Sequence, residues 1–375
     1  MKKIQMVDLQ SQYKKIKKTV NAYIQEVLNS SAYINGTYVH DFQKQLEEYL
    51  GVKHVIPCAN GTDALQIALM GLGLKPGDEI ITVNFTFAST VEVIALLNLV
   101  PVLVDVELDT FNIDIKALKK AISSKTKAII PVHLFGQCAN MEAITAIADE
   151  HNLFVVEDTA QALGSDYIFS NQSQKKAGTI GHIGTTSFFP SKNLGCYGDG
   201  GAIFTNDDLL AKTLRGIVNH GMYKKYYHDI IGVNSRLDSV QAAVLKAKLP
   251  LLDSYCSARI KAAEYYTTAF KNNANLITPV ISNYSTHVFH QYTLRISNGK
   301  RDELCQYLLE KNIPNAIYYP VPLHAQKAYK SQRYKESDFK NTNKLVNEVI
   351  SLPMHTELET DQLKYISQTV NNFLN

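Results

Sequence analysis

Apolar positions recur along the first half of the chain with alternating spacings, which predicts strands that alternate with helices. Helical spacing begins at residues 11–29 and returns at 42–50. Short apolar runs then predict strands at 52–57, 79–83, 102–105, 126–133 and 154–157. Between them, helical spacing predicts helices at 63–72, 88–97, 115–122 and 141–151. Buried strands that alternate with helices are typical of an α/β domain with a mostly parallel sheet.

The pattern changes after residue 165. A polar stretch at 166–180 is interpreted as a hairpin, and apolar runs at 185–189 and 202–204 predict two more strands. Helical spacing over 239–249 meets Pro250, which cannot continue a helix but suits the first turn of the next one, to about residue 270. We therefore predict a large domain over residues 1–249 and a small C-terminal α+β domain over residues 250–375. The small domain should contain strands at 287–296 and 316–318 and helices at 301–311, 344–349 and 360–373.

Lys192 lies in a loop between two predicted strands, where lysine is unusual. Glycines at 195, 198, 200 and 201 follow it, and such small residues let a flat ligand approach the backbone. A partly desolvated lysine at a strand end is a candidate imine-forming nucleophile. The alternative is a solvated lysine in a turn.

Asp158 ends the predicted strand at 154–157, so its carboxylate should lie at the carboxyl edge of a parallel sheet, where ligands bind. Pyridoxal phosphate needs a lysine for its Schiff base and an acid at its ring nitrogen. Asp158 and Lys192, on two strand ends, could converge over one such ring. The alternative for Asp158 is an N-cap of a following helix.

Two further stretches suit a flat, phosphorylated ligand. The turn at residues 58–62 precedes a helix, whose free N–H groups and dipole can hold a phosphate, although an ordinary capping loop has the same composition. Phe87 follows another strand end. Its ring could stack on a cofactor or belong to the core.

Composition narrows the class of protein. The chain has 375 residues and a net charge of +3 without a long basic patch, so nothing favours nucleic-acid binding. Its five cysteines are scattered, which indicates free thiols and no metal site. No signal-peptide pattern or membrane-length apolar run is present, and we expect a cytoplasmic protein without a membrane partner. The early strands lack a Gly-x-Gly-x-x-Gly turn, which weakens a nicotinamide-dependent alternative.

Five motifs resemble those of the DegT/DnrJ/EryC1/StrS family of sugar aminotransferases. They are Asn60–Leu65, Glu157–Gln161, Ser187–Lys192, Gly198–Gly201 and Gly232–Asp238. The resemblance extends from about residue 5 to the end of the chain. It implies the PLP-dependent transferase fold type I, the aspartate-aminotransferase type, with a large domain and a smaller C-terminal one.

The resemblance also implies roles for residues at matching positions. Lys192 would bind pyridoxal phosphate covalently and move the substrate proton, Asp158 would pair with the ring nitrogen, and Gln161 would neighbour the ring hydroxyl. Phe87 would stack on the ring. The phosphate would be bound by Gly61, Thr62, Ser187 and, from a partner subunit, Asn234. Substrate would be contacted by Arg236, also across a homodimer, and by Tyr318 and His324. Tyr318 stands where many members have a histidine before Tyr-Pro.

The same resemblance implies an amino transfer from L-glutamate to a nucleotide-linked keto-sugar. The stretches 131–138 and 187–201 are most similar to enzymes that aminate UDP-2-acetamido-2-deoxy-3-oxo-glucuronic acid for bacterial surface polysaccharides such as O-antigen or capsule. Amination of a dTDP- or UDP-linked 3-keto or 4-keto deoxysugar is the alternative enzyme. A non-catalytic regulatory protein that binds the cofactor is the alternative outside enzymes. The basic and aromatic loop 223–228 suits either a nucleotide diphosphate or a subunit interface.

Overall fold

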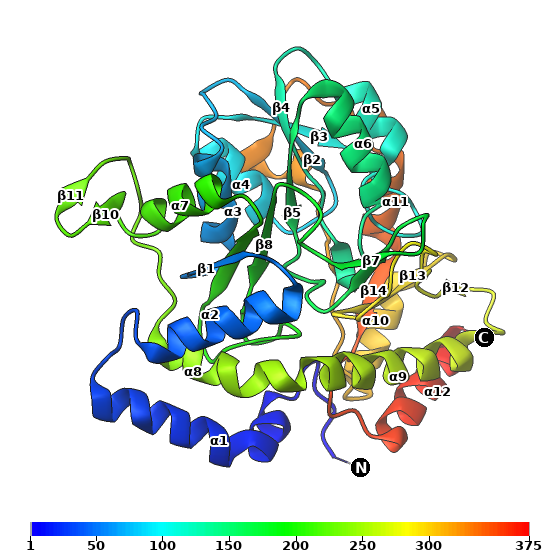
Figure 1. Ribbon diagram of the computed structural model, residues 1–375. Helices are drawn as coiled ribbons and strands as arrows, with labels where there is room; N and C mark the ends of the chain where they lie inside the picture. The colour runs from blue at the N-terminus through cyan, green and yellow to red at the C-terminus, as the bar shows by residue number, and fades with distance from the viewer. Residues whose placement is uncertain (1, 375) are drawn as a thin grey trace.

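A seven-stranded sheet lies at the centre of the computed structural model, which describes residues 2–374 (Figure 1). Its strand order is β1-β9-β8-β5-β4-β2-β3, and only β9 runs antiparallel to its neighbours. The mostly parallel sheet predicted from the sequence is therefore confirmed. Its strands are β1 (His54–Cys58), β2 (Glu79–Val83), β3 (Val100–Val104), β4 (Thr126–Ile130), β5 (Phe154–Asp158), β8 (Ile183–Ser187) and β9 (Gly201–Thr205).

Helices cover both faces of this sheet, because its strands are apolar on both sides. Neighbouring residues such as Ile80 and Ile81 enter two different hydrophobic clusters, one on each face. Helices α5 and α6 lie on one side of the sheet, and α3, α4 and α7 lie on the other (Figure 1). Their bounds are α3 (Gly61–Gly71), α4 (Ser89–Leu96), α5 (Ile115–Ala121), α6 (Met141–His151) and α7 (Asp208–Ile217).

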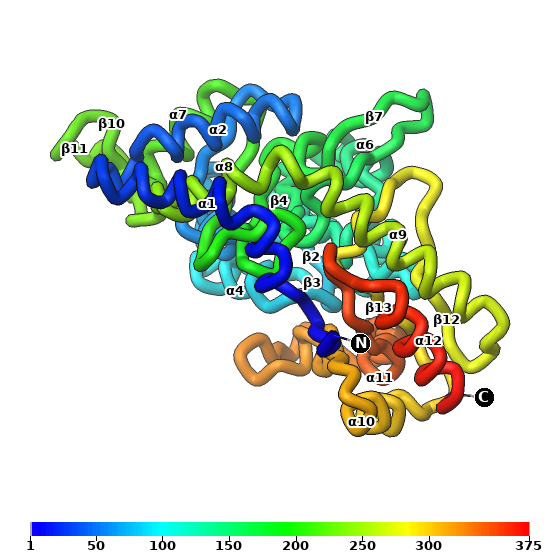
Figure 2. The backbone as a smooth tube through the Cα atoms, turned by 90° about the horizontal axis from the view of Figure 1, so that it is seen from below, coloured from blue at the N-terminus to red at the C-terminus, as the bar shows by residue number. Residues whose placement is uncertain are grey.

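Four further helices flank the sheet at its β1 end and below it. α1 (Leu9–Ser30) and α2 (Thr37–Leu50) both pack on α8 (Ser239–Lys248). A short turn containing Pro250 separates α8 from α9 (Leu252–Phe270), so the predicted break between two helices is confirmed. Figure 2 shows α8 and α9 following one another along the molecule toward the C-terminal region.

The C-terminal region packs around its own cluster, to which Ile4 from the start of the chain also contributes. A three-stranded antiparallel sheet, in the order β12-β13-β14, is covered by α9, α10 and α12. This separate core supports a domain boundary at residue 250, and the division into two domains remains a proposal. Residues 1 and 375 lie outside the described chain. The elements are β12 (Leu276–Ile277), β13 (Tyr292–Ile296), α10 (Arg301–Glu310), α11 (Lys340–Glu348), β14 (Val349–Leu352) and α12 (Thr360–Leu374).

Three expectations for this region were wrong. The strand expected at 287–296 begins only at Tyr292, because Phe289 has a left-handed backbone with φ of 45° that no strand accommodates. The strand expected at 316–318 is a single bridge between Ala316 and Ser351. The helix expected at 344–349 begins at Lys340 and gives way to β14 at residue 349.

Two hairpins extend from the sheet. β6 (Asp166–Ile168) and β7 (Gln174–Lys176) form the hairpin predicted at 166–180. β10 (Met222–Lys224) and β11 (Tyr227–His228) form a second one, which projects from the body in both views (Figures 1 and 2). Among residues 2–374, no helix combines the length and the apolar character that crossing a membrane requires.

Candidate active site

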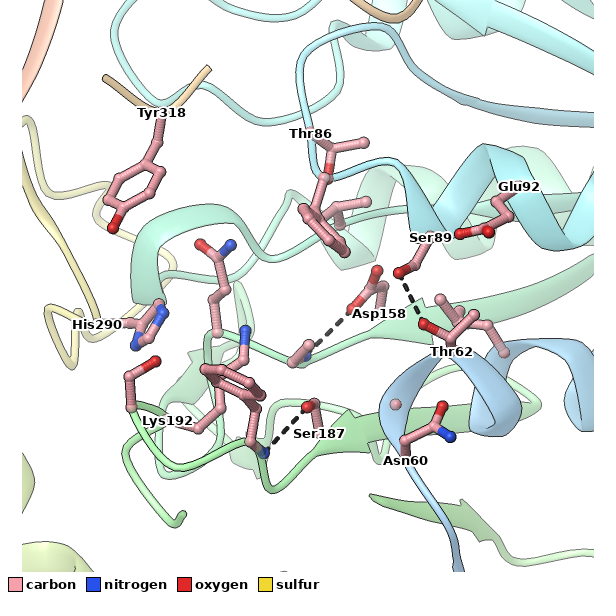
Figure 3. A pocket seen from close by; sticks show the side chains of 18 of the residues that line it. Asn60, Thr62, Thr86, Ser89, Glu92, Asp158, Ser187, Lys192, His290 and Tyr318 are labelled. Carbon is pink, nitrogen blue, oxygen red and sulfur yellow. Dashed lines mark hydrogen bonds between the residues drawn. The ribbon is translucent and has the colours of Figure 1, made fainter. Parts of the chain in front are cut away.

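A pocket of about 820 Å³ opens at the carboxyl ends of the parallel strands. It brings together eight of the residues singled out from the sequence: Gly61, Thr62, Phe87, Asp158, Gln161, Ser187, Lys192 and Tyr318. In the view of Figure 3, Lys192 and Tyr318 lie on one side of the pocket, while Asn60 and Thr62 lie on the other. Residues distant in sequence therefore meet where parallel strands end, as the alternating pattern predicts.

Asp158 is the last residue of β5, and its carboxylate is fixed from two directions. Thr90 Oγ1, on α4, donates to Asp158 Oδ2 at 3.0 Å, and the Ala160 N–H donates to Oδ1 at 3.1 Å. Residues 159–164 form turns rather than a helix, so the N-cap alternative for Asp158 is wrong. A carboxylate held this way presents its oxygens to the pocket in a fixed orientation.

Lys192 lies in a tight loop after β8. Its N–H donates to the Phe189 carbonyl at 2.9 Å, and its amine reaches the pocket. Burial lowers the pKa of Lys192 to about 8, and the nearby Asp158 carboxylate acts in the opposite direction. The amine is therefore partly neutral near neutral pH, which excludes the fully solvated lysine considered above and suits a nucleophile.

A second buried lysine supports the loop that carries Lys192. Lys248 Nζ, from the last turn of α8, donates to the Gly195 carbonyl at 2.7 Å and lies 4.6 Å from the centroid of the Tyr197 ring. Lys248 is only 1% exposed, and burial lowers its pKa to about 8. A Cβ on Gly195 would lie 2.4 Å from the Pro190 carbonyl oxygen, so the loop closes on itself too tightly for a side chain there.

The N-terminus of α3 forms a narrow polar cradle. Asn60 Oδ1 caps this helix by accepting from the Asp63 N–H at 2.8 Å, and Thr62 Oγ1 lies 2.8 Å from Ser89 Oγ. A Cβ on Gly61 would lie 2.6 Å from the Ser187 Cβ. Because helix N–H groups and hydroxyls point into this space, and no side chain fits at residue 61, the cradle suits a phosphate.

Gln161 and Phe87 line the wall between the cradle and the C-terminal region. Gln161 Oε1 accepts from the Phe135 N–H at 2.8 Å, and its Nε2 donates to the Tyr319 hydroxyl at 3.1 Å. Phe87 is 58% exposed in the pocket, with its ring centroid 6.4 Å from that of Tyr319. The core alternative for Phe87 is therefore wrong, whereas Phe85 is the buried aromatic of that turn.

Three residues with expected roles do not line the pocket of this chain. Asn234 is exposed and Arg236 is half-buried, both in the segment between the β10–β11 hairpin and α8. His324 is buried elsewhere: its Nδ1 lies 2.7 Å from Asn84 Nδ2 and its Nε2 lies 3.2 Å from Glu336 Oε1. Their roles as partner-subunit or substrate contacts stay predictions.

The structure also adds residues that the motifs did not indicate. Thr90 lies inside a helix, and Lys248 ends a helix that carries no recognisable site motif. Ser89, His290 and Tyr319 line the pocket as well. Two of these residues had a signal in the sequence: Tyr319 belongs to the Tyr-Pro pair that follows Tyr318, and His290 lies in the strand expected at 287–296.

Comparison with known families gives one match over nearly the whole chain. The model of the DegT/DnrJ/EryC1/StrS aminotransferase family matches residues 14–371. Among solved structures, an aminotransferase of that family from Brucella abortus superimposes with a TM-score of 0.94 at 42% identity, covering 99% of this chain and all of the other. NtdA from Bacillus subtilis, solved with the cofactor PMP, gives a TM-score of 0.88 at 30% identity over 96% of this chain and 82% of its own.

Curated relatives carry several descriptions. A pleiotropic regulatory protein from Geobacillus stearothermophilus is 46% identical over 99% of this chain and 98% of its own. A UDP-2-acetamido-2-deoxy-3-oxo-D-glucuronate aminotransferase from Pseudomonas aeruginosa is 43% identical over 98% of this chain and 100% of its own. A dTDP-3-amino-3,6-dideoxy-alpha-D-galactopyranose transaminase from Aneurinibacillus thermoaerophilus is 38% identical over 99% of each chain.

These matches extend over the strands and helices that build the pocket as well as over the C-terminal region. The fold is that of the PLP-dependent transferases of type I, which the resemblance of the motifs implied. The chain belongs to the DegT/DnrJ/EryC1/StrS aminotransferase family and is a pyridoxal phosphate-dependent transferase.

Proposed function

We propose that this enzyme transfers an amino group from L-glutamate to a UDP-linked 3-keto-sugar, UDP-2-acetamido-2-deoxy-3-oxo-glucuronic acid. The observation that carries the amino-transfer chemistry is the convergence of Lys192 and Asp158 in one pocket beside a phosphate cradle. The choice of acceptor is supported by the 43% identity to the Pseudomonas enzyme over its full length.

The residues present fit pyridoxal phosphate. The cradle at Gly61, Thr62 and Ser187 has the donors and the free space that a phosphate needs. Asp158 offers a fixed carboxylate for the protonated ring nitrogen, and the exposed Phe87 ring offers a face for stacking. Gln161 is already oriented by Phe135 and Tyr319, so its amide can hydrogen-bond a ring substituent.

The chain's own residues supply binding, orientation and proton transfer. Bound pyridoxal phosphate supplies a carbonyl for the lysine and draws electrons from the substrate carbon. With the cofactor bound, Lys192 Nζ would act as the general base that takes a proton from the substrate carbon, and would then donate it to the former carbonyl carbon of the cofactor. Its lowered pKa favours the neutral amine that this step requires. Asp158 would pair with the protonated ring nitrogen, and Thr90 holds Asp158 in place.

The C6 carboxylate of the proposed sugar needs a cationic partner. Arg236 is half-buried, and its guanidinium makes no hydrogen bond or ion pair with another of residues 2–374, which leaves it free to contact a second subunit. Guanidinium groups suit planar, bidentate recognition of carboxylates. We therefore propose a homodimer in which Arg236 and Asn234 complete the partner's site, and in which the β10–β11 hairpin lies near the nucleotide. Glutamate as donor, a cytoplasmic location and a role in surface polysaccharide synthesis belong to the same proposal.

Two alternative functions differ from this proposal. The Aneurinibacillus relative acts on a dTDP-linked sugar, and the cofactor residues would be the same for such an acceptor. The Geobacillus relative is described as a regulatory protein. A purely regulatory protein would not need Lys192 at the pocket beside a fixed Asp158, so the site favours catalysis.

The first test is spectroscopic. We expect the purified protein with pyridoxal phosphate to absorb at about 400–430 nm, and glutamate alone to replace that band by the pyridoxamine form. UDP- and dTDP-linked keto-sugars, each with and without a C6 carboxylate, are then offered to the glutamate-treated enzyme. Selective recovery of the band with the UDP-linked uronate supports the proposal. Equal recovery with sugars that lack the carboxylate would contradict the acceptor but not the chemistry.

A mixing experiment tests the shared site. Lys192→Ala and Arg236→Ala chains are inactive or impaired alone, and dimers that exchange subunits should regain part of the activity because one site then has both residues. Mixed dimers that are no more active than either parent would contradict sharing. Mixing Lys192→Ala with Asp158→Ala chains provides the control. Both residues line the pocket of the same chain, so each site of such a mixed dimer lacks one of them and activity should not return.

A further inference from the structure

His290 is a buried imidazole that faces the pocket without a protein partner. It lines the pocket and is 5% exposed, and neither ring nitrogen has a hydrogen-bond partner among residues 2–374. Nδ1 is fully enclosed, so Nε2 is the nitrogen that a ligand in the pocket can reach. Figure 3 shows it on the same side of the pocket as Lys192. A polar atom that stays without a partner costs free energy once it is desolvated, so an unpartnered Nε2 at a ligand site indicates a partner brought by the ligand.

The backbone that carries His290 is held in a strained conformation. Phe289 has φ of 45°, which a bulky side chain rarely adopts. The Phe289 N–H donates to His287 Nδ1 at 3.0 Å, and the two rings stack with centroids 3.9 Å apart. The Val288 N–H donates to the Gly136 carbonyl at 2.8 Å. These contacts turn the chain so that residue 290 faces the pocket instead of continuing into β13.

A buried cation fixes the same segment from behind. Arg259, on α9, is 3% exposed, and its Nη1 donates to the carbonyls of Phe289 and His290, each at 3.3 Å, and to that of Met354 at 2.9 Å. No carboxylate within residues 2–374 pairs with this guanidinium, and burial lowers its pKa to about 10. An unneutralised cation is costly to bury. Its use here to fix two carbonyls indicates that the position of His290 matters.

The imidazole is neutral in this setting. Burial lowers the pKa of His290 well below its usual value, and the nearby charges of Lys192 and Arg259 act in the same direction. A neutral imidazole has one N–H donor and one acceptor nitrogen. It therefore matches a hydroxyl, which also donates and accepts, better than a carboxylate, which requires a cation.

We infer that His290 hydrogen-bonds the hydroxyl on the sugar carbon next to the one that receives the amino group, and thereby selects acceptors that carry this hydroxyl. The inference rests on the proposed keto-sugar acceptor. Lys192 must reach the reacting carbon, and His290 lies on the same side of the pocket, where a substituent one carbon away comes within its reach. For the proposed 3-keto-sugar this substituent is the C4 hydroxyl. The C6 carboxylate is left to Arg236 of the second subunit.

The test compares two half-reactions on the complete enzyme. The glutamate-treated holoenzyme is mixed with the 3-keto-sugar or with its 4-deoxy analogue, and return of the 400–430 nm band gives kcat/KM for each. Wild type should prefer the hydroxylated sugar by at least about tenfold, which is the range of one buried hydrogen bond. In His290→Leu this preference should fall to within about twofold, and the loss with the hydroxylated sugar should exceed the loss in the glutamate half-reaction.

Two further variants keep the result interpretable. His290→Gln retains a donor and an acceptor near the Nε2 position and should recover part of the preference, even if His290→Leu folds poorly. His287→Asn keeps the acceptor for the Phe289 N–H but removes the ring that stacks on Phe289, so it measures how much of any change comes from disturbance of the segment alone. Melting temperature and cofactor absorbance are recorded for every variant.

Several outcomes overturn the inference. One is a wild-type enzyme that uses the 4-deoxy sugar equally well, and another is a preference that survives in His290→Leu. A loss that falls equally on the glutamate half-reaction would show that His290 serves Lys192 and not the sugar. If the wild type is reduced by glutamate but accepts no keto-sugar, the proposed function fails and the role of His290 fails with it.

Discussion

Thr90 Oγ1 donates to Asp158 Oδ2 at 3.0 Å, which ties helix α4 to the end of strand β5. Thr90 is 1% exposed and Asp158 is 7% exposed, so water does not compete for this bond. The carboxylate that we propose as the partner of the cofactor ring is therefore oriented by a residue outside every recognised motif. Its orientation depends on how α4 packs on the sheet.

Thr90→Val should weaken the cofactor site without unfolding the protein. Valine has the shape of threonine but no donor, and a hydrogen bond to a charged group contributes about 1.5–3 kcal/mol. We expect the Kd for pyridoxal phosphate, measured by fluorescence titration of the apoenzyme, to rise at least about tenfold. Thr90→Ser keeps the hydroxyl and should stay close to wild type. Equal affinities in all three proteins would contradict a role for this bond.

The lowered pKa of Lys192 predicts how the apoenzyme takes up its cofactor. Only the neutral amine condenses with an aldehyde, and its fraction grows as pH rises through about 8, against 10.5 for an unperturbed lysine. The initial rate of absorbance gain after adding pyridoxal phosphate should therefore be half-maximal near pH 8. Lys192→Ala should show no such gain at any pH. A midpoint above pH 10 in the wild type would refute the desolvated amine.

Gly61→Ala should impair phosphate binding because the new Cβ would lie 2.6 Å from the Ser187 Cβ, and both atoms belong to short, stiff segments of the cradle. We expect at least a tenfold higher Kd for pyridoxal phosphate. Gly71→Ala, on the same helix, is the matched control. Its Cβ would meet the flexible end of Leu214 at 2.7 Å, far from the cradle, so only stability should change. Similar cofactor affinities for both variants would contradict the cradle.

Lys248 should make the stability of the apoenzyme depend on pH. Its folded pKa of about 8 lies below the 10.5 of an unfolded lysine, so between these values the unfolded chain binds more protons and folding gains stability as pH rises. The unfolding free energy of wild type minus that of Lys248→Met should grow between about pH 8 and 10.5, by at most about 3 kcal/mol.

Lys246→Met is the control for this experiment. Lys246 lies on the same helix but pairs with Asp41 at 2.6 Å near the surface. Chemical denaturation of the three proteins at pH 7.5, 9 and 10 gives the differences directly. A difference between wild type and Lys248→Met that is flat with pH would show that Lys248 is not desolvated.

The parts of the fold that the sequence predicts are those that periodicity and local chemistry determine. Strands β2, β4 and β5 each contain a short apolar run, and the ends of β2 and β5 place Phe87 and Asp158 at one edge of the sheet. Helix α7 was overlooked, although Asp207 caps it and Leu210, Leu214 and Ile217 follow at helical spacing. A closer search for capping residues would have found it.

Other features depend on tertiary contacts and leave no local trace. The apolar run 287–296 has the composition of a strand, but contacts to Gly136 and Arg259 force a bend at Phe289. Thr90 and Lys248 act through partners 68 and 53 residues away. His324 follows a loop motif, yet Asn84 and Glu336 hold it away from the pocket. Such long-range contacts cannot be deduced from one sequence.

The origin of each pocket residue has a consequence for how the enzyme can change its substrate. Asp158, Ser187 and Gly61 belong to the sheet or begin a helix that packs on it, whereas His290 and Tyr318 come from irregular segments of the C-terminal region. If the proposed roles hold, we expect mutations in those segments to change acceptor preference while the cofactor residues stay in place. The segments that carry His290 and Tyr318 could therefore be exchanged between relatives, and few substitutions in them could adapt the enzyme to new sugars.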